Sequence, residues 1–322
     1  MLLVAAACSG GGSAAPALPL RRVDDVALPG SNGRFDYVSL DAGRHLLVIA
    51  HLADSTVIGF DIAVRRVVWQ ARGVRSVHGV RVAPEIGRAY ASATGTNEVV
   101  ALDEGGGAAL GRAPTGRFPD GLAYDPRRQA VFVSDKDGGT VTVVDAKTFS
   151  VLGTVPVGAD VGNVQYDDVA DTMVVAVGST NELVTVDAAS RRVESHVALP
   201  GCRGAHGVAV DAQVRRAFVA CEHNATVVSV DLARGAVTGR QPTGSTPDVL
   251  AVDAGLNRLY VAAESGVVSA YTTSGASLRL IGKSKVADSA HTVAVDPVTH
   301  LVYLPLANLD GHPALRVLRP GR

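Results

Sequence analysis

Short apolar segments that close at an aspartate recur at regular intervals along almost the whole chain. One series ends at Asp41, Asp125, Asp167, Asp211, Asp253 and Asp296, with successive gaps of 84, 42, 44, 42 and 43 residues, and Ala83 fills the place missing from the first gap. A second series ends at Asp61, Asp103, Asp145, Asp187 and Asp231. A fixed period of this kind is the signature of a repeat protein, so the pattern predicts seven copies of a unit of about 42 residues.

The third unit shows what each copy contains. It divides into four apolar segments rich in Val, Tyr, Phe and Thr: DGLAYDP (120–126), AVFVSDK (130–136), TVTVVDA (140–146) and VLGTVPVG (151–158). Segments of this composition between Gly, Asp and Pro indicate short β-strands. Four strands repeated seven times predict an all-β fold, a seven-bladed β-propeller with four antiparallel strands per blade. Because a blade buries both faces against its neighbours, its strands are apolar throughout rather than alternating.

The two ends of the chain complement each other. The seventh unit has three strand-like segments, HTVAVDP, LVYLPLA and ALRVLRP, and lacks a fourth. Residues 22–30, RVDDVALPG, resemble the fourth strand of the fourth unit, RVESHVALPG (192–201). We therefore expect the N-terminal strand to complete the last blade of a propeller that spans residues 21–322, which leaves no unpaired inner edge.

The units resemble the YVTN-type β-propeller repeat family. The core signature, an apolar strand and a small or Asn-like turn followed by T-V-x-x-x-D, is found here as VFVSDKDGGTVTVVD, AFVACEHNATVVSVD and VVAVGSTNELVTVD, and the sixth blade departs from it where Tyr271-Thr272 replaces the Asp. The resemblance implies a lactonase-like or surface-layer-like propeller. It is specific for the fold and weak for activity, since related propellers include binding proteins, surface proteins, lactonases and lyases.

One position of the repeat concentrates ionisable residues. The residues expected where each innermost strand starts, at the top of the central channel, are Asp36, His78, Asp120, Gly162, His206, Asp248 and His291. The symmetry of a propeller points them at one axis. We expect the six ionisable side chains to form a funnel for a small-molecule or protein ligand. A metal or acid–base site and simple solvation of a wet channel mouth are the alternatives, and a Gly that follows Asp or His is also ordinary turn chemistry.

The same positions supply the candidates for chemistry. Imidazole and carboxylate groups suit a divalent transition metal, and the metal-ligand candidates are His78, His206, His291 and His223. Asp and His held together also shift each other's pKa, as acid–base catalysis requires. The catalytic candidates are His206, His291 and Asp248.

Two further sets are expected near the channel mouth. Residues at or near the ends of the second strands should rim the same face: His51, Asp135, Asn181, Glu222, His223, Glu264 and Asn308. Three arginines precede innermost strands and are candidates for binding an anionic group by bidentate contacts: Arg34, Arg117 and Arg203. Since the chain has 26 Arg and 4 Lys, ordinary surface arginine is the alternative for each of them.

Cys202 and Cys221 both fall in the fifth unit. A hairpin that pairs Asp211 with Arg216 would pair His206 with Cys221 and bring Cys202 to the same end of the blade. A Cys202–Cys221 disulfide is favoured, with two free thiols or a thiolate–imidazole metal site as alternatives. The spacing matches no common zinc pattern.

Residues 1–20 do not read as part of the fold. Their sequence, MLLVAAACSGGGSAAPALPL, places small residues before Cys8 and a Gly/Ser/Ala linker after it. This resembles the end of a bacterial lipoprotein signal, although the apolar stretch is short and no Lys or Arg precedes it. We expect a signal remnant and flexible linker, lipidation at Cys8, and a periplasmic or cell-surface location. A cytoplasmic N-terminal tail is the alternative.

Composition narrows the function classes. With 30 basic and 31 acidic residues and a net charge of −1, the chain has no basic field to recruit nucleic acid. No apolar run reaches the roughly 18 residues of a membrane helix, so contact with a membrane is expected only through a lipid at Cys8. These observations favour a monomeric binding or scaffold protein. The alternative is a metal-dependent lactonase-like hydrolase or lyase that uses the same ring of His and Asp.

Overall fold

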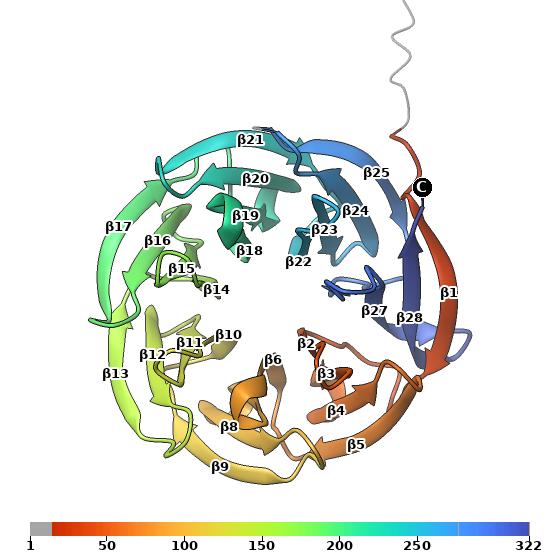
Figure 1. Cartoon of the computed structure of the whole chain (residues 1–322), viewed down its shortest axis with the longest axis horizontal. Coiled ribbons are helices and arrows are strands. Elements are labelled where there is room, and N and C mark those ends of the chain that lie inside the picture. Colours follow the sequence, from red (N-terminus) through yellow and green to blue (C-terminus); the bar gives the residue numbers. More distant parts are fainter. Residues whose placement is uncertain (1–14, 276, 322) are drawn as a thin grey trace, which may run out of the picture.

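The chain forms a ring of seven four-stranded antiparallel sheets, which confirms the seven-bladed β-propeller (Figure 1). The structure is a computed structural model and describes residues 15–275 and 277–321. Cys8 and most of the proposed signal segment lie outside the described residues. No helix within the described ranges is long and apolar enough to cross a membrane.

Each blade runs from the channel outward in chain order, except the last. Blades one to three contain β2 (Val38–Asp41), β3 (Leu46–His51), β4 (Thr56–Asp61) and β5 (Arg66–Arg72); β6 (Val77–Ala83), β7 (Arg88–Ala93), β8 (Glu98–Asp103) and β9 (Ala109–Pro114); and β10 (Pro119–Asp125), β11 (Ala130–Asp135), β12 (Thr140–Asp145) and β13 (Val151–Pro156). Blades four to six contain β14 (Val161–Asp167), β15 (Thr172–Val177), β16 (Glu182–Asp187) and β17 (Arg192–Ala198); β18 (Ala205–Asp211), β19 (Arg216–Cys221), β20 (Thr226–Asp231) and β21 (Ala236–Pro242); and β22 (Pro247–Asp253), β23 (Arg258–Ala263), β24 (Val267–Thr272) and β25 (Arg279–Lys285). Short 3₁₀ turns lie at Leu52–Asp54, Pro84–Ile86, Thr94–Thr96, Ala212–Val214 and Glu222–Asn224.

The last blade joins the two ends of the chain. Its order is β26 (Ala294–Val295), β27 (Val302–Leu309), β28 (His312–Pro320) and then β1 (Leu20–Ala27), which pairs with β28 along the outside of the ring (Figure 1). The guanidinium of Arg316 adds a bidentate contact to Asp25, at 2.7 and 2.9 Å. The N-terminal segment therefore completes the ring, as the sequence predicts.

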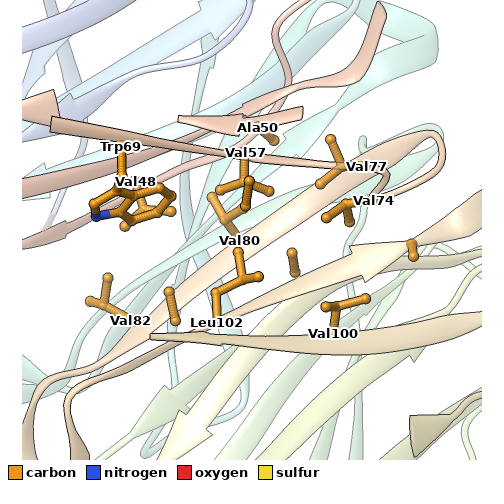
Figure 2. Packing of buried hydrophobic residues seen from close by; sticks show 14 of the residues in the cluster. Val48, Ala50, Val57, Trp69, Val74, Val77, Val80, Val82, Val100 and Leu102 are labelled. Carbon is orange, nitrogen blue, oxygen red and sulfur yellow. The ribbon is translucent and has the colours of Figure 1, made fainter. Parts of the chain in front are cut away.

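The hydrophobic core is divided among the blade interfaces. The buried apolar residues fall into seven clusters, each of which draws on two neighbouring blades. Figure 2 shows the cluster between blades one and two, where Trp69 packs with Val48, Val80 and Val82. Because both faces of a blade are covered in this way, strands such as TVTVVD are apolar at successive positions.

The repeated aspartates stabilise turns. The Asp125 carboxylate accepts the backbone N–H of Arg127 at 2.8 Å after an innermost strand. The Asp145 carboxylate does the same for Lys147 and Thr148 after a third strand. Carboxylates that accept backbone N–H groups two or three residues later favour such turns, so this part of the repeat pattern is structural.

A β-bulge sits in the innermost strand at the level of the ring of ionisable residues. In blades two to six the register slips by one residue near the start of the strand, for example between Ala205 and Val208. Ala205 therefore pairs with Cys221, and the predicted pairing of His206 with Cys221 is wrong. The extra residue belongs to the His206–Gly207 step. A bulge re-aims the side chain that it contains.

Candidate functional site

The six ionisable side chains of the ring position, each from a different blade, converge at one end of the channel. We call the cavity at this end the channel-mouth pocket. Its cavity has a volume of about 370 Å³, and the charged and imidazole side chains that line it are Arg34, Asp36, His78, Asp120, Lys136, His206, Glu222, Asp248 and Glu264. His291 lies beside the pocket, with its Nε2 atom 3.8 Å from Asp36 Oδ1. The fourth blade contributes Gly162 and leaves its place in the ring without a side chain.

Local backbone geometry aims these residues at the axis. In blades two to seven the residue two places before the ring position has a positive φ: Ser76, Phe118, Asp160, Gly204, Thr246 and Ser289. This left-handed residue turns the chain into the innermost strand. The Gly that follows the ring residue serves packing, because a Cβ at Gly207 would lie 1.7 Å from the carbonyl oxygen of Asp248. The His-Gly and Asp-Gly pairs thus mark a close approach of neighbouring blades as well as a turn.

The first group in the pocket is Asp36, Asp248 and His291, which are 1%, 3% and 1% exposed. The His291 ring donates its Nδ1–H to the carbonyl of Ser289 at 2.9 Å. Its Nε2 atom lies 3.8 Å from Asp36 Oδ1 and 4.0 Å from Asp248 Oδ2. Within the described part of the chain, that Nε2 and both Asp36 oxygens are buried without a hydrogen-bond partner.

The second group is His206, Glu222 and Asp248. His206 Nε2 lies 3.7 Å from Asp248 Oδ1 and 3.8 Å from Glu222 Oε1. It is also 3.8 Å from Asp120 Oδ2. All three separations exceed a hydrogen bond. The two groups share Asp248, which turns one carboxylate oxygen toward each.

The pocket rim is set by the first residue after the second strand of a blade. Leu52, Lys136, Glu222 and Glu264 occupy this place in four blades and line the pocket. Glu222 and Glu264 were expected there, whereas the sequence argument missed Lys136. The signal was available, because residues 52, 94, 136, 222 and 264 keep the spacing of the repeat.

Several residues expected at the rim lie elsewhere. His51 stacks on Phe35 with ring centroids 4.2 Å apart, and Asp135 accepts the hydroxyls of Thr140 and Thr142 at 2.7 Å. Both come one residue before the lining position, and alternate residues of a strand face opposite sides. Asn181 and Asn308 accept backbone N–H groups in loops.

Of the three candidate arginines, the structure places only Arg34 in the pocket. Its Nη1 atom donates to Glu264 at 2.6 Å, and its Nη2 atom lies 3.5 Å from Asp248 Oδ2. Arg117 and Arg203 are exposed and do not line the pocket, and neither does the exposed His223. His223 is the second residue of the 3₁₀ turn Glu222–Asn224, and its ring lies beside Gly204.

Tyr37 forms the floor of the pocket. Its hydroxyl accepts the amide N–H of Asn163 at 2.6 Å and donates to Asp248 Oδ1 at 3.4 Å. The floor thus links blades one, four and six. Beneath it the channel holds a larger cavity of about 580 Å³ that Tyr37 also lines.

Burial dominates the electrostatics of the pocket. It raises the pKa of Asp248 to about 8 despite the opposing effect of His291, and it raises the pKa of Asp120 and Glu222. Burial also opposes the ionisation of Asp36, but His291 and Arg34 outweigh it and lower the pKa of Asp36. The pocket therefore holds a carboxylate beside a protonated carboxylic acid at neutral pH. Such a pair can exchange a proton with a ligand, or release its proton to solvent when a cation binds.

Cys202 and Cys221 are joined by a disulfide, with their Cα atoms 5.3 Å apart. Cys221 is followed directly by Glu222, and Cys202 lies four residues before His206. The bond therefore connects the two segments of blade five that carry His206 and Glu222, two of the three residues of the second group.

Comparisons with known proteins identify the fold and no more. No family model and no curated protein matches the sequence. Among the solved structures, the chain is similar to the hydrazine synthase of Kuenenia stuttgartiensis, with 15% identity over 88% of this chain and 94% of that one and a TM-score of 0.75. It is also similar to a chain of a mitotic checkpoint complex, with 12% identity over 100% of this chain and 97% of that one and a TM-score of 0.79. In all, 1808 solved chains match, and a fold this widely shared does not specify function.

Proposed function

We propose that this protein is a YVTN-type binding propeller whose channel-mouth pocket holds a small cation or the cationic group of a larger ligand. The observation that carries the proposal is the buried face-to-face arrangement of Asp36 and His291, whose facing atoms have no partner among the described residues. Buried polar atoms without partners are rare in proteins, and a bound ion, ligand or ordered water is a common reason for them.

The charge balance supports the same ligand. Five carboxyl groups line the pocket and only two side chains with a permanent positive charge accompany them: Asp36, Asp120, Glu222, Asp248 and Glu264 against Arg34 and Lys136. In surroundings of low dielectric constant, an excess of carboxylates favours a bound cation. The donor set of imidazole and carboxylate groups suits a divalent transition metal.

The experiment combines metal analysis with thermal unfolding of the purified full chain. Wild type would be incubated with Zn²⁺, Mn²⁺, Cu²⁺, Fe²⁺ or Mg²⁺, and separately with choline or spermidine. A ligand at 100 times its Kd stabilises the native state by about 2.7 kcal/mol, so a rise in Tm of several degrees is expected for at least one cation. The variant H206A/H291A should lose the response, while H196A/H312A, which removes two exposed histidines, should keep it. The proposal fails if no cation is bound and none raises the Tm.

A second candidate function, a metal-dependent lactonase-like hydrolase or lyase, is favoured by the two groups of one imidazole and two carboxylates that surround a common cavity. A bound divalent metal would polarise a substrate carbonyl or lower the pKa of a water molecule. Hydrolysis of a panel of small lactones by metal-loaded wild type, absent in Asp248→Asn, would support this candidate. If no lactone of the panel were hydrolysed at saturating metal, the enzyme candidate would fail and only the binding function would stand.

We also propose that the protein is exported, is anchored by a lipid on Cys8 at the bacterial periplasmic or cell surface, and works there as a monomer. The small residues before Cys8 support export, and a Cys202–Cys221 disulfide suits an oxidising compartment. In cells, Cys8→Ala should lose labelling by a fatty-acid analogue and leave the membrane fraction, and the released protein should elute at the 33.0 kDa of one chain. Unchanged labelling and fractionation would contradict the anchor.

A further inference from the structure

The two groups of the channel-mouth pocket are held together by one carboxylate. Asp248 Oδ1 faces His206 Nε2 at 3.7 Å, and Asp248 Oδ2 faces His291 Nε2 at 4.0 Å. Glu222 completes the group on one side and Asp36 completes the group on the other. A carboxylate that turns each oxygen toward a different imidazole and a different second carboxylate is placed as a bridge between two cations.

The size of each group fits an ion. The facing atoms within a group lie 3.7–4.0 Å from the imidazole nitrogen. Because the three ligand atoms of each group all lie within 4.8 Å of one another, a point equidistant from them lies at most about 2.5 Å from each, a little longer than the 2.0–2.2 Å bonds that His and carboxylate ligands make to a divalent transition metal. Small side-chain rotations would bring the donors to bonding distance. The separations are too long for the groups to satisfy one another directly.

The orientation of His291 suits a ligand. The carbonyl of Ser289 can only accept, so Nδ1 must carry the hydrogen of that contact. Nε2 is then the atom turned toward the carboxylates. His78 shows the same arrangement, because its Nδ1–H donates to the carbonyl of Ser76 at 2.9 Å and its Nε2 faces Asp36 Oδ2 at 3.9 Å. Histidines that bind metals usually fix their ring in this way, through the other nitrogen.

Arg34 does not remove the need for cations. Its shortest contact is with Glu264 at 2.6 Å, and its Nη2 atom lies 3.5 Å from Asp248 Oδ2. Its Nε atom is buried without a partner 3.8 Å from Asp36. Glu264 therefore takes the closest contact of Arg34, and only part of the charge of Arg34 acts on Asp36 and Asp248. Four other carboxyl groups line the pocket: Asp36, Asp120, Glu222 and Asp248. Among the described lining residues, Lys136 is the one other side chain with a permanent positive charge.

We propose that the channel-mouth pocket is a dinuclear site for divalent transition metals, in which Asp248 bridges one ion held with Asp36 and His291 and a second held with His206 and Glu222. This inference rests on the proposed function and goes further, because it fixes the number of ions and divides the ligands between them. Two ions bridged by a carboxylate lie close enough to bind the same anionic group of a ligand, which is the arrangement that two-metal hydrolases use.

The test is the Mn²⁺ stoichiometry of the full-length protein after equilibrium dialysis, together with its electron paramagnetic resonance spectrum. Wild type should bind two Mn²⁺ per chain and show the broadened signal of exchange-coupled ions at two equivalents. Glu222→Gln and His291→Asn should each bind one Mn²⁺ with the six-line signal of an isolated ion. Asp248→Asn should bind less than one. Glu182→Gln, which alters a partly exposed carboxylate paired with His196 outside the pocket, should behave as wild type.

The outcomes separate the two proposals. One Mn²⁺ per chain in wild type, lost in either Glu222→Gln or His291→Asn alone, would overturn the dinuclear site and leave the cation-binding function intact. Two ions with uncoupled signals would overturn the bridge. The absence of any bound ion, with stabilisation by an organic cation, would also overturn the dinuclear site and keep the binding function. The absence of both would overturn both proposals. The wild-type titration needs no variant to fold.

Discussion

Reduction of the Cys202–Cys221 disulfide provides a quantitative test of how blade five is stabilised. The bond closes a loop with a sequence separation of 19 residues. The chain-entropy relation gives about 3 kcal/mol for a loop of this length at 25 °C. Both cysteines are buried in the cluster between blades four and five, so the bond also holds packed groups in place. We expect reduction to lower the free energy of unfolding by about 3 kcal/mol.

Urea unfolding of the full chain, followed by far-UV circular dichroism, measures this difference. With a slope of about 3 kcal/mol per molar urea, expected for a large domain, the midpoint should fall by about 1 M on reduction. Reduced wild type isolates the cross-link because both side chains remain, and C202A/C221A, measured with and without reductant, serves as the control that should not respond. Equal midpoints for oxidised and reduced wild type would refute the argument, since the loop would then be equally constrained without the bond.

Three further predictions test other parts of the structure. Burial raises the pKa of Glu104 to about 7, above its unfolded value, so the native state should lose stability as the pH rises from about 4.5 to 7. Glu104→Gln should therefore be more stable than wild type by up to about 3 kcal/mol at pH 8 and nearly as stable as wild type at pH 4. An equal gain in urea midpoint at both pH values would contradict this. In Gly207→Ala the new Cβ would lie 1.7 Å from the carbonyl oxygen of Asp248, so the free energy of unfolding in urea should fall by about 1–3 kcal/mol. Gly106→Ala, where the atom nearest to the new Cβ is 3.6 Å away, is the control that should show no such loss. Removal of residues 1–27 deletes β1 (Leu20–Ala27) and should lower the Tm and speed proteolysis of the last blade, whereas an unchanged Tm would show that β28 needs no outer partner.

Repetition explains why the fold could be predicted in detail. A single strand such as TVTVVD could be assigned only weakly, but the same apolar segment, turn and aspartate return every 42 residues or so. Each copy supports the assignment of the others. Counting the strands of each copy showed that the last unit lacks a fourth strand. The pairing of β1 with β28 confirms that the N-terminal segment supplies it.

The site could be placed but not assembled from the sequence. The repeat located the ring position in every blade. It does not determine, to within one residue, how neighbouring strands pair. The bulge at His206–Gly207 shifted the pairing with Cys221, and the choice between His51 and Leu52 at the rim depended on which face of the strand end turned inward. Contacts across the channel, such as that of Tyr37 with Asn163, join blades far apart in sequence and leave no periodic signal.

Comparison among the seven blades distinguishes the ring position, for which we propose a binding role, from positions that stabilise the fold. Where a residue caps the turn after the innermost strand, its type is kept in most blades, as at Asp125, Asp167 and Asp253, and Ala83 in the second blade is the exception. The ring position instead varies among Asp, His and Gly, so no shared backbone requirement fixes it. Its carboxylates are nevertheless buried, and both oxygens of Asp36 have no hydrogen-bond partner among the described residues. Burial of ionisable groups without full compensation costs several kcal/mol. A fold gains nothing from that cost, whereas a bound cation would recover it. Burial raises the pKa of Asp120 and Asp248, so the apoprotein should become more stable at neutral pH when these two side chains are neutralised. Asp120→Asn with Asp248→Asn should therefore raise the urea midpoint of metal-free protein while it abolishes cation binding. A lower midpoint together with retained binding would assign these carboxylates to the fold instead.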